Sequence, residues 1–85
     1  MTDSNEAIRR RLRRAQGQLG GILRMLEAGR SCDEVVTQLM AVREAVDRVA
    51  VEVVAAHLDE CLTRLPPEQA REKAGQAVKL LGRLG

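Results

Sequence analysis

The sequence contains no phenylalanine, tyrosine or tryptophan, although 45% of its 85 residues are hydrophobic. Its apolar side chains are mainly aliphatic, as is typical of packing between helices. Few β-branched residues alternate with polar ones, and that alternation is the pattern of a strand. A chain of this length forms one small domain, residues 1–85, whose core is marginal on its own. The expectation is an all-α domain that oligomerises.

The sequence also shows no recognisable targeting signal and no membrane-spanning segment. Residues 1–14 are polar and basic and include no apolar run like that of a signal peptide. No apolar stretch approaches the roughly 20 residues that a membrane-spanning helix needs. We therefore expect a cytoplasmic protein with no membrane partner. Because cytoplasmic thiols are kept reduced, the two cysteines are expected to be functional thiols and not a structural disulfide.

The chain has one histidine and no glycine-rich phosphate-binding loop. So thin a helical bundle also offers no plausible substrate pocket. These observations predict that the protein is not an enzyme.

Positive charge is concentrated in the first part of the chain, although the net charge is only +2. Five arginines occupy six consecutive positions, and acidic residues are found later in the chain, among them Asp59, Glu60, Glu68 and Glu72. A basic first third favours a polyanionic partner such as DNA over the simpler alternative of a solvated helix face. The arginines concerned are Arg9, Arg10, Arg11, Arg13 and Arg14, followed by Arg24, Arg30, Arg43 and Arg48.

Apolar residues at steps of three and four predict three helices, at about 5–28, 32–64 and 67–84. Gly29 is a natural residue for the first stop, and Ser31 with Glu34 fits a capping box. Pro66 and Pro67 end the second helix and begin the third. The predicted apolar stripes are Ile8, Leu12, Ala15, Leu19, Ile22 and Leu26; Val35, Leu39, Val42, Val46, Val49, Val53 and Leu58; and Ala70, Ala74, Ala77, Val78, Leu81 and Leu84.

The predicted middle helix is too long for one chain to cover. At 1.5 Å per residue its 33 residues extend roughly 50 Å, whereas an 85-residue globule has a radius of gyration of about 12 Å. Its apolar face is therefore expected to meet a second protomer in an antiparallel four-helix bundle.

Cys32, His57 and Cys61 all fall on that helix. His57 and Cys61 are four residues apart and share one face, but Cys32 is roughly 37 Å from His57 along the helix. If a twofold axis crosses the helix near Ala45 or Val46, Cys32 of one chain comes beside His57 and Cys61 of the other. Two thiolates and one imidazole suit Cu(I), whereas zinc, nickel or cobalt would need another ligand. The plainer alternative is two buried, inert cysteines and an ordinary histidine.

The chain resembles the family of the copper-sensing repressor CsoR and the RcnR-type regulators over nearly its whole length. This resemblance implies a homotetramer, a dimer of dimers, that represses transcription and releases its operator DNA when the effector binds. It also implies roles in DNA binding for Arg11 and Arg48, with Arg14 nearby. The matching residues are Arg11-Leu12-Arg13-Arg14-Ala15-Gln16-Gly17-Gln18-Leu19, Gly21-Ile22, Met25-Leu26-Glu27, Cys32, Val36-Thr37-Gln38-Leu39, Ala41-Val42-Arg43, Val49-Ala50, His57-Leu58 and Cys61.

The resemblance leaves two effectors open. Copper sensors of this family usually carry a tyrosine before the first cysteine and a glutamate in the third helix; this sequence assigns those places to Ser31 and Ala77. Persulfide-sensing relatives (CstR-like) also have the two cysteines and lack that tyrosine, but they generally lack the histidine. The favoured effector is Cu(I), bound by Cys32, His57 and Cys61. The alternative is persulfide or polysulfide, which would cross-link Cys32 to Cys61 of a second subunit.

Overall fold

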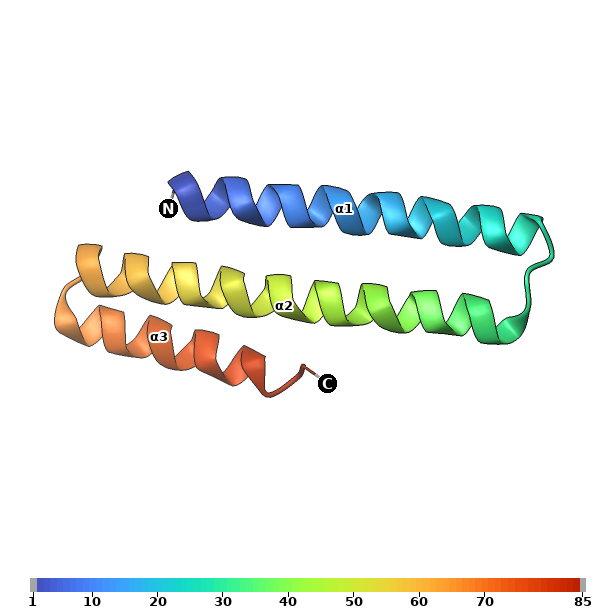
Figure 1. The fold of residues 1–85 in the computed structure, drawn as a ribbon. Coiled ribbons are helices and arrows are strands. Elements are labelled where there is room, and N and C mark those ends of the chain that lie inside the picture. The colour runs from blue at the N-terminus through green and yellow to red at the C-terminus, as the bar shows by residue number, and fades with distance from the viewer. Residues whose placement is uncertain (1, 85) are drawn as a thin grey trace.

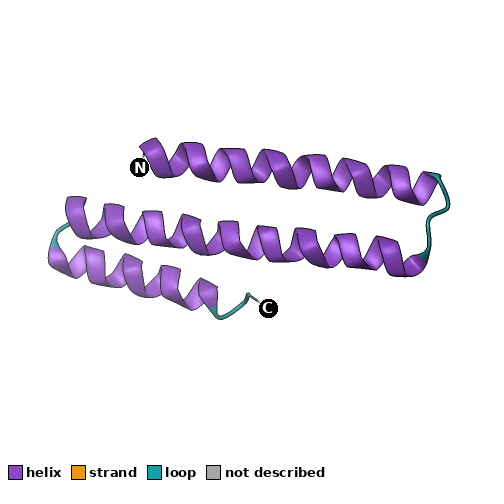
Figure 2. Ribbon diagram, viewed as in Figure 1, coloured by secondary structure: helices purple, strands orange, loops and turns teal. Residues whose placement is uncertain are grey.

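The computed structural model describes residues 2–84. These residues form three α-helices and no strand, as the all-α prediction expected (Figures 1 and 2). The helices are α1 (Thr2–Glu27), α2 (Cys32–Arg64) and α3 (Pro67–Leu81). None of the three combines the length and apolarity needed to cross a bilayer.

The helices lie side by side in one flat layer, with α2 between α1 and α3 (Figure 1). The layer measures 55 × 26 × 12 Å, and its smallest dimension is about the diameter of a single helix. Within the described range, α1 packs on α2 and α3 packs on α2, but α1 and α3 do not meet. A protomer of this shape has seams between helices and no second layer to cover its faces.

Two helix ends differ from the sequence prediction, namely the start of α1 and the end of α3. α1 begins at Thr2 and not near residue 5, because no glycine or proline interrupts the first residues. α3 ends at Leu81 and not at residue 84. Beyond it, the backbone N–H groups of Gly82, Arg83 and Leu84 donate to carbonyls three residues back, which is the tighter 3₁₀-type pattern common at helix ends.

Gly29 stops α1 by adopting a left-handed conformation, with φ of +70°. The N–H of Arg30 donates to the carbonyl of Met25 at 3.0 Å, and that of Gly29 donates to Leu26 at 3.2 Å. These two bonds are the Schellman motif, which satisfies the last carbonyls of the helix. The chain can therefore reverse direction within four residues.

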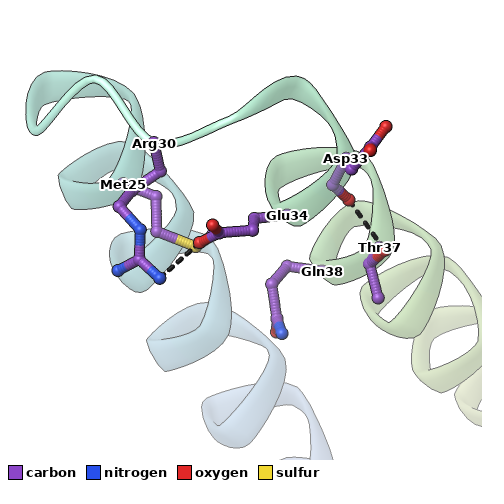
Figure 3. A pocket seen from close by; sticks show the side chains of 6 residues that line it. All are labelled: Met25, Arg30, Asp33, Glu34, Thr37 and Gln38. Atoms are coloured by element: carbon purple, nitrogen blue, oxygen red, sulfur yellow. Dashed lines mark hydrogen bonds and ion pairs between the residues drawn. The ribbon is translucent and has the colours of Figure 1, made fainter.

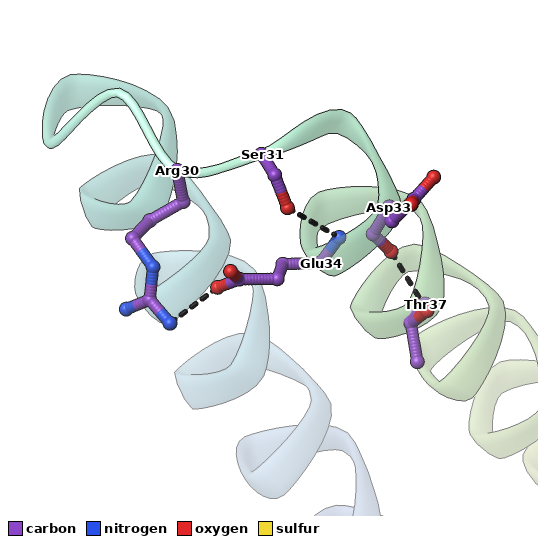
Figure 4. Close-up of polar contacts among 5 residues, drawn as sticks. All are labelled: Arg30, Ser31, Asp33, Glu34 and Thr37. Atoms are coloured by element: carbon purple, nitrogen blue, oxygen red, sulfur yellow. Dashed lines mark hydrogen bonds and ion pairs between the residues drawn. The ribbon is translucent and has the colours of Figure 1, made fainter.

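The start of α2 follows only half of the predicted capping box. Ser31 Oγ accepts a hydrogen bond from the N–H of Glu34 at 3.3 Å (Figure 4). The Glu34 carboxylate does not return to Ser31 but forms an ion pair with Arg30. One further local bond, from Thr37 Oγ1 to the carbonyl of Asp33 at 2.7 Å, lies in the next turn. Cys32 is thereby fixed as the first residue of α2.

Apart from Cys61, the buried residues recur every seven positions within each helix, and in α1 and α2 this spacing divides the predicted apolar stripe into two rows. One row lies in the seams between helices, and the other is about half exposed, at 44–59%. The buried row is Ile8, Ala15 and Ile22 in α1, Val35, Val42 and Val49 in α2, and Ala70 and Ala77 in α3; the exposed row is Leu12, Leu19 and Leu26 in α1 with Leu39, Val46 and Val53 in α2.

The exposed rows of α1 and α2 lie on the same face of the layer. In both helices each exposed residue follows a buried one by four positions, as Leu12 follows Ile8 and Leu39 follows Val35. Four residues advance a helix by slightly more than one turn, so each row is rotated in the same sense about its own axis. Because the two helices are antiparallel and face each other, equal rotations bring both rows to one side. That side of α1 and α2 therefore carries two rows of partly exposed aliphatic side chains.

Candidate functional site

His57 and Cys61 come together on one face of α2. Cys61 Sγ lies 3.5 Å from Nε2 of His57, one turn away. Cys61 is 3% exposed, because α3 folds back beside it, whereas His57 is exposed. Both residues line a pocket of about 260 Å³ between the end of α2 and the start of α3. The Cys61 side chain of this pair is therefore buried, and the His57 side chain is exposed to solvent beside the pocket.

The spacing of these two atoms fits a shared soft metal ion. Metal–sulfur and metal–imidazole bonds of about 2.3 and 2.0 Å, at the angles of tetrahedral or trigonal geometry, place the two donors roughly 3.5–3.8 Å apart. The observed 3.5 Å lies in that range. A neutral imidazole offers one nitrogen as a ligand, and the tautomer decides which.

Cys32 lies at the opposite end of α2 and is exposed. It is 29 residues before Cys61, which corresponds to about 44 Å of helix. In the part of the chain that the structure describes, no three histidine, cysteine, aspartate or glutamate side chains are close enough to hold one ion. One protomer thus brings together two of the three predicted ligands and keeps the third far away.

Near Cys32, a pocket of about 390 Å³ lies between the end of α1 and the start of α2. Figure 3 shows its lining residues: Met25, Arg30, Asp33, Glu34, Thr37 and Gln38. Cys32 is not among them, and the Glu34 carboxylate is paired with Arg30. This pocket therefore does not add a ligand set to Cys32 within the same protomer.

The α3 residue that lines the pocket of His57 and Cys61 in the protomer is Lys73. Ala77, the position that the family resemblance assigns to a glutamate, is not among the residues that line this pocket. Ala77 is 5% exposed and lies further along the helix. Only Leu65 and Pro66 connect the two helices, so residues about equally far from this connection face each other. Lys73 is seven residues after Pro66, and His57 is eight residues before Leu65. These nearly equal separations could have identified the lysine from the sequence.

The three predicted DNA-contacting arginines also come together. Arg11 and Arg14 from α1 and Arg48 from α2 line one pocket of about 110 Å³, together with Gln18 and Ala45. Arg11 and Arg48 are each 18 residues from the nearer end of the Gly29-Arg30 turn, so the antiparallel hairpin pairs them. The result is a basic patch assembled from two helices.

One acidic residue, Glu52, lies within this patch, and the sequence analysis did not single it out. Its Oε1 atom forms an ion pair with Nη1 of Arg11 across the α1–α2 seam. The same oxygen is 3.8 Å from Nε of Arg48, one turn earlier on α2. The Glu52 side chain is 26% exposed, against 44% for Arg11 and 74% for Arg48. Glu52 is therefore the least exposed of these three side chains.

Comparison with known proteins gives a match over nearly the whole chain. A family described as "Metal-sensitive transcriptional repressor" matches residues 4–83. The copper-sensing transcriptional repressor RicR of Mycobacterium tuberculosis is 40% identical over 67 residues, which are 79% of this chain and 70% of RicR. The copper-sensing transcriptional repressor CsoR of Mycobacterium ulcerans is 38% identical over 63 residues, 74% of this chain and 54% of that protein. CsoR of Bacillus subtilis is 35% identical over 57 residues, 67% of this chain and 56% of that protein. The matched region therefore spans little more than half of either CsoR relative.

Proposed function

The chain belongs to the family of metal-sensitive transcriptional repressors, and from this membership we propose that it binds operator DNA in the cytoplasm and releases it when Cu(I) binds. Three relatives that match this chain at 35–40% identity are named copper-sensing repressors. The soft sulfur and nitrogen donors of this chain suit the same ion. The whole of residues 1–85 acts in this proposal as one sensing and DNA-binding domain.

The proposed effector site consists of His57 and Cys61 of one subunit and Cys32 of the other. The observation that carries it is the 3.5 Å separation between Cys61 Sγ and His57 Nε2. The third ligand comes from a second subunit, because helix length keeps Cys32 of the same chain about 44 Å away. Its exposure at the end of α2 leaves it available to a partner.

The proposed dimer is an antiparallel four-helix bundle, and two such dimers form the tetramer. Six half-exposed leucine and valine side chains on one face of α1 and α2 support this arrangement. Completing the burial of a Leu or Val that is already half buried contributes about 0.8–1.5 kcal/mol, or roughly 5–9 kcal/mol for the six in each protomer. Two protomers together supply enough to offset an association cost of about 4–15 kcal/mol.

The proposed DNA contacts are made by Arg11, Arg14 and Arg48. These guanidinium groups can donate to phosphate oxygens, and their charge supplies the sequence-independent part of the affinity. By linkage, the effector must bind the DNA-free form more tightly than the DNA-bound form, by about 1–3 kcal/mol or more.

A titration of the protein–operator complex with Cu(I) under anaerobic conditions tests the proposal. We expect DNA affinity to fall by about 5- to 150-fold at saturation, and unchanged affinity would refute release by copper. His57→Ala should abolish the response without unfolding the protein, because the side chain is exposed. Lys79→Ala, in the last turn of α3, is the matched control on the surface.

Mass spectrometry of the reduced protein separates copper binding from sulfur chemistry. Incubation with Cu(I) should give a metal adduct that is lost in His57→Ala. Incubation with polysulfide should leave the subunits separable. If polysulfide instead gives a covalent dimer and releases the DNA, and His57→Ala retains both effects, the effector is a sulfur species and the copper proposal is wrong.

A further inference from the structure

The Glu52 carboxylate lies where two of the proposed DNA-contacting arginines meet. It pairs with Arg11 across the α1–α2 seam and lies 3.8 Å from Nε of Arg48. Both arginine side chains are more exposed than that of the glutamate, so they are open to solvent while their shared anionic partner is the least exposed of the three. A phosphate that approaches this patch meets guanidinium groups that already have an anionic partner.

We propose that Glu52 is an internal competitor of phosphate, which lowers the DNA affinity of the repressor by holding the guanidinium groups of Arg11 and Arg48. This inference rests on the proposed function, because it concerns the same DNA-binding patch. It goes further than that proposal because it makes an acidic residue a determinant of the DNA affinity and of its salt dependence.

The charges of the patch support a competitive role. Arg11, Arg14 and Arg48 contribute three positive charges, and Glu52 offsets one of them while the Arg11 and Arg48 side chains remain partly exposed. Because Glu52 offsets part of the positive charge that neutralises phosphates, the wild-type patch should displace fewer of the cations condensed on the DNA than the same patch without this carboxylate. Removing the carboxylate charge should therefore increase both the affinity and the steepness of its salt dependence.

Competition also suits a repressor that must be released. An effector that changes DNA affinity through a coupling of 1–3 kcal/mol empties an operator only if the starting affinity is moderate. Glu52, on α2 and five residues before His57, keeps the DNA affinity of the effector-free protein in that range. When the DNA dissociates, its carboxylate pairs with the arginines again.

The test compares wild type with Glu52→Gln and Glu52→Ala, using a mixed-sequence duplex of about 30 base pairs as probe. Binding is measured between 50 and 300 mM KCl without effector. Both variants should bind about two- to fivefold more tightly per contacting protomer near 0.1 M salt, with a steeper slope of log affinity against log salt. Gln keeps the shape of the side chain and Ala does not, so a shared increase reports charge and not positioning.

Glu68→Gln is the matched control, because it makes the same charge change in the first turn of α3. Glu52 is 12 residues from the end of α2, roughly 18 Å by helical rise, and α3 begins beyond that end on the side away from α1 (Figure 1). This separation exceeds the Debye length of about 10 Å at 0.1 M salt. The control should bind like wild type.

The outcomes separate the two proposals. If wild type and all variants fail to bind DNA in a salt-dependent manner, the proposed function is wrong and this inference is lost with it. If wild type binds but both Glu52 variants show an unchanged or weaker affinity and the wild-type slope, the competition is refuted and the repressor function stands. Circular dichroism of each variant identifies any that is unfolded, and the remaining one then decides.

Discussion

Cys61 holds its sulfur 3.5 Å from Nε2 of His57, and this pair is near the α3 end of a helix whose first residue is Cys32. A single protomer therefore carries part of the proposed ligand set at each end of α2. If two antiparallel copies join, these parts complete each other twice. This arrangement is testable without knowledge of the operator.

Complementation between two inactive variants tests whether the site is shared. Cys32→Ala keeps His57 and Cys61, whereas a His57→Ala/Cys61→Ala double variant keeps Cys32. Neither homodimer has a complete site, but each mixed dimer regains one. After unfolding and refolding an equal mixture, random pairing makes half of the dimers mixed, so about a quarter of the sites should bind Cu(I) tightly. Anaerobic competition with a Cu(I) chelator measures this fraction. No recovery in mixtures that form mixed dimers would contradict a site shared between subunits.

Local signals account for what the sequence predicted correctly about the fold. Gly29 supplies the positive φ that ends α1, Ser31 caps α2, and Leu65 is held extended by the proline after it. Each of these acts within a few residues, so it is visible without the fold. The start of α1 and the end of α3 lack such strong signals, and there the predicted bounds differ by about three residues.

Relations between helices were less predictable. Apolar periodicity did not distinguish Val42, which lies in the seam, from Val46, which is exposed, because the distinction depends on where α1 lies. Lys73 and Glu52 gain their neighbours from the registers of the α2–α3 and α1–α2 hairpins. Charge counting alone treated both as ordinary surface residues. Contacts between subunits are harder still to predict from one sequence, because they depend on how a second chain packs against the first.

Val46→Glu should convert the proposed oligomer into monomers. Val46 is 44% exposed in the protomer and lies on the aliphatic face that the proposed bundle covers. Burying a carboxylate there without a partner should weaken dimerisation by at least about 100-fold. Sedimentation velocity across protein concentrations measures the change. Gln69→Glu adds the same charge to an exposed position of α3 and should leave the oligomer intact. An unchanged oligomer in Val46→Glu would remove this face from the interface.

Arg48→Ala should weaken DNA binding and reduce its salt dependence. Arg48 is 74% exposed, so its guanidinium can reach a phosphate. The loss of one phosphate contact per protomer should lower the slope of log affinity against log salt by about 0.9 for each contacting protomer. Arg71→Ala removes the same charge from α3 and should have a much smaller effect. Fluorescence anisotropy at several KCl concentrations gives both slopes. Equal effects of the two variants would indicate a general charge effect and no localised contact.

Lys73→Ala should increase Cu(I) affinity. Lys73 lines the same pocket as His57 and Cys61 and brings a positive charge toward the place where a cation is expected. Partly exposed charges of like sign repel by at most about 1 kcal/mol, so the gain should be about two- to fivefold. Lys73→Glu should gain more, because a carboxylate attracts the cation and can accept a hydrogen bond from the N–H of the ring nitrogen that does not bind the metal. Competition with a Cu(I) chelator measures both affinities, with Lys79→Ala as the control in the last turn of the same helix. If Lys73→Glu weakens binding, then the pocket lined by α3 is not where the ion is held, and the ligand set proposed around His57 must be revised.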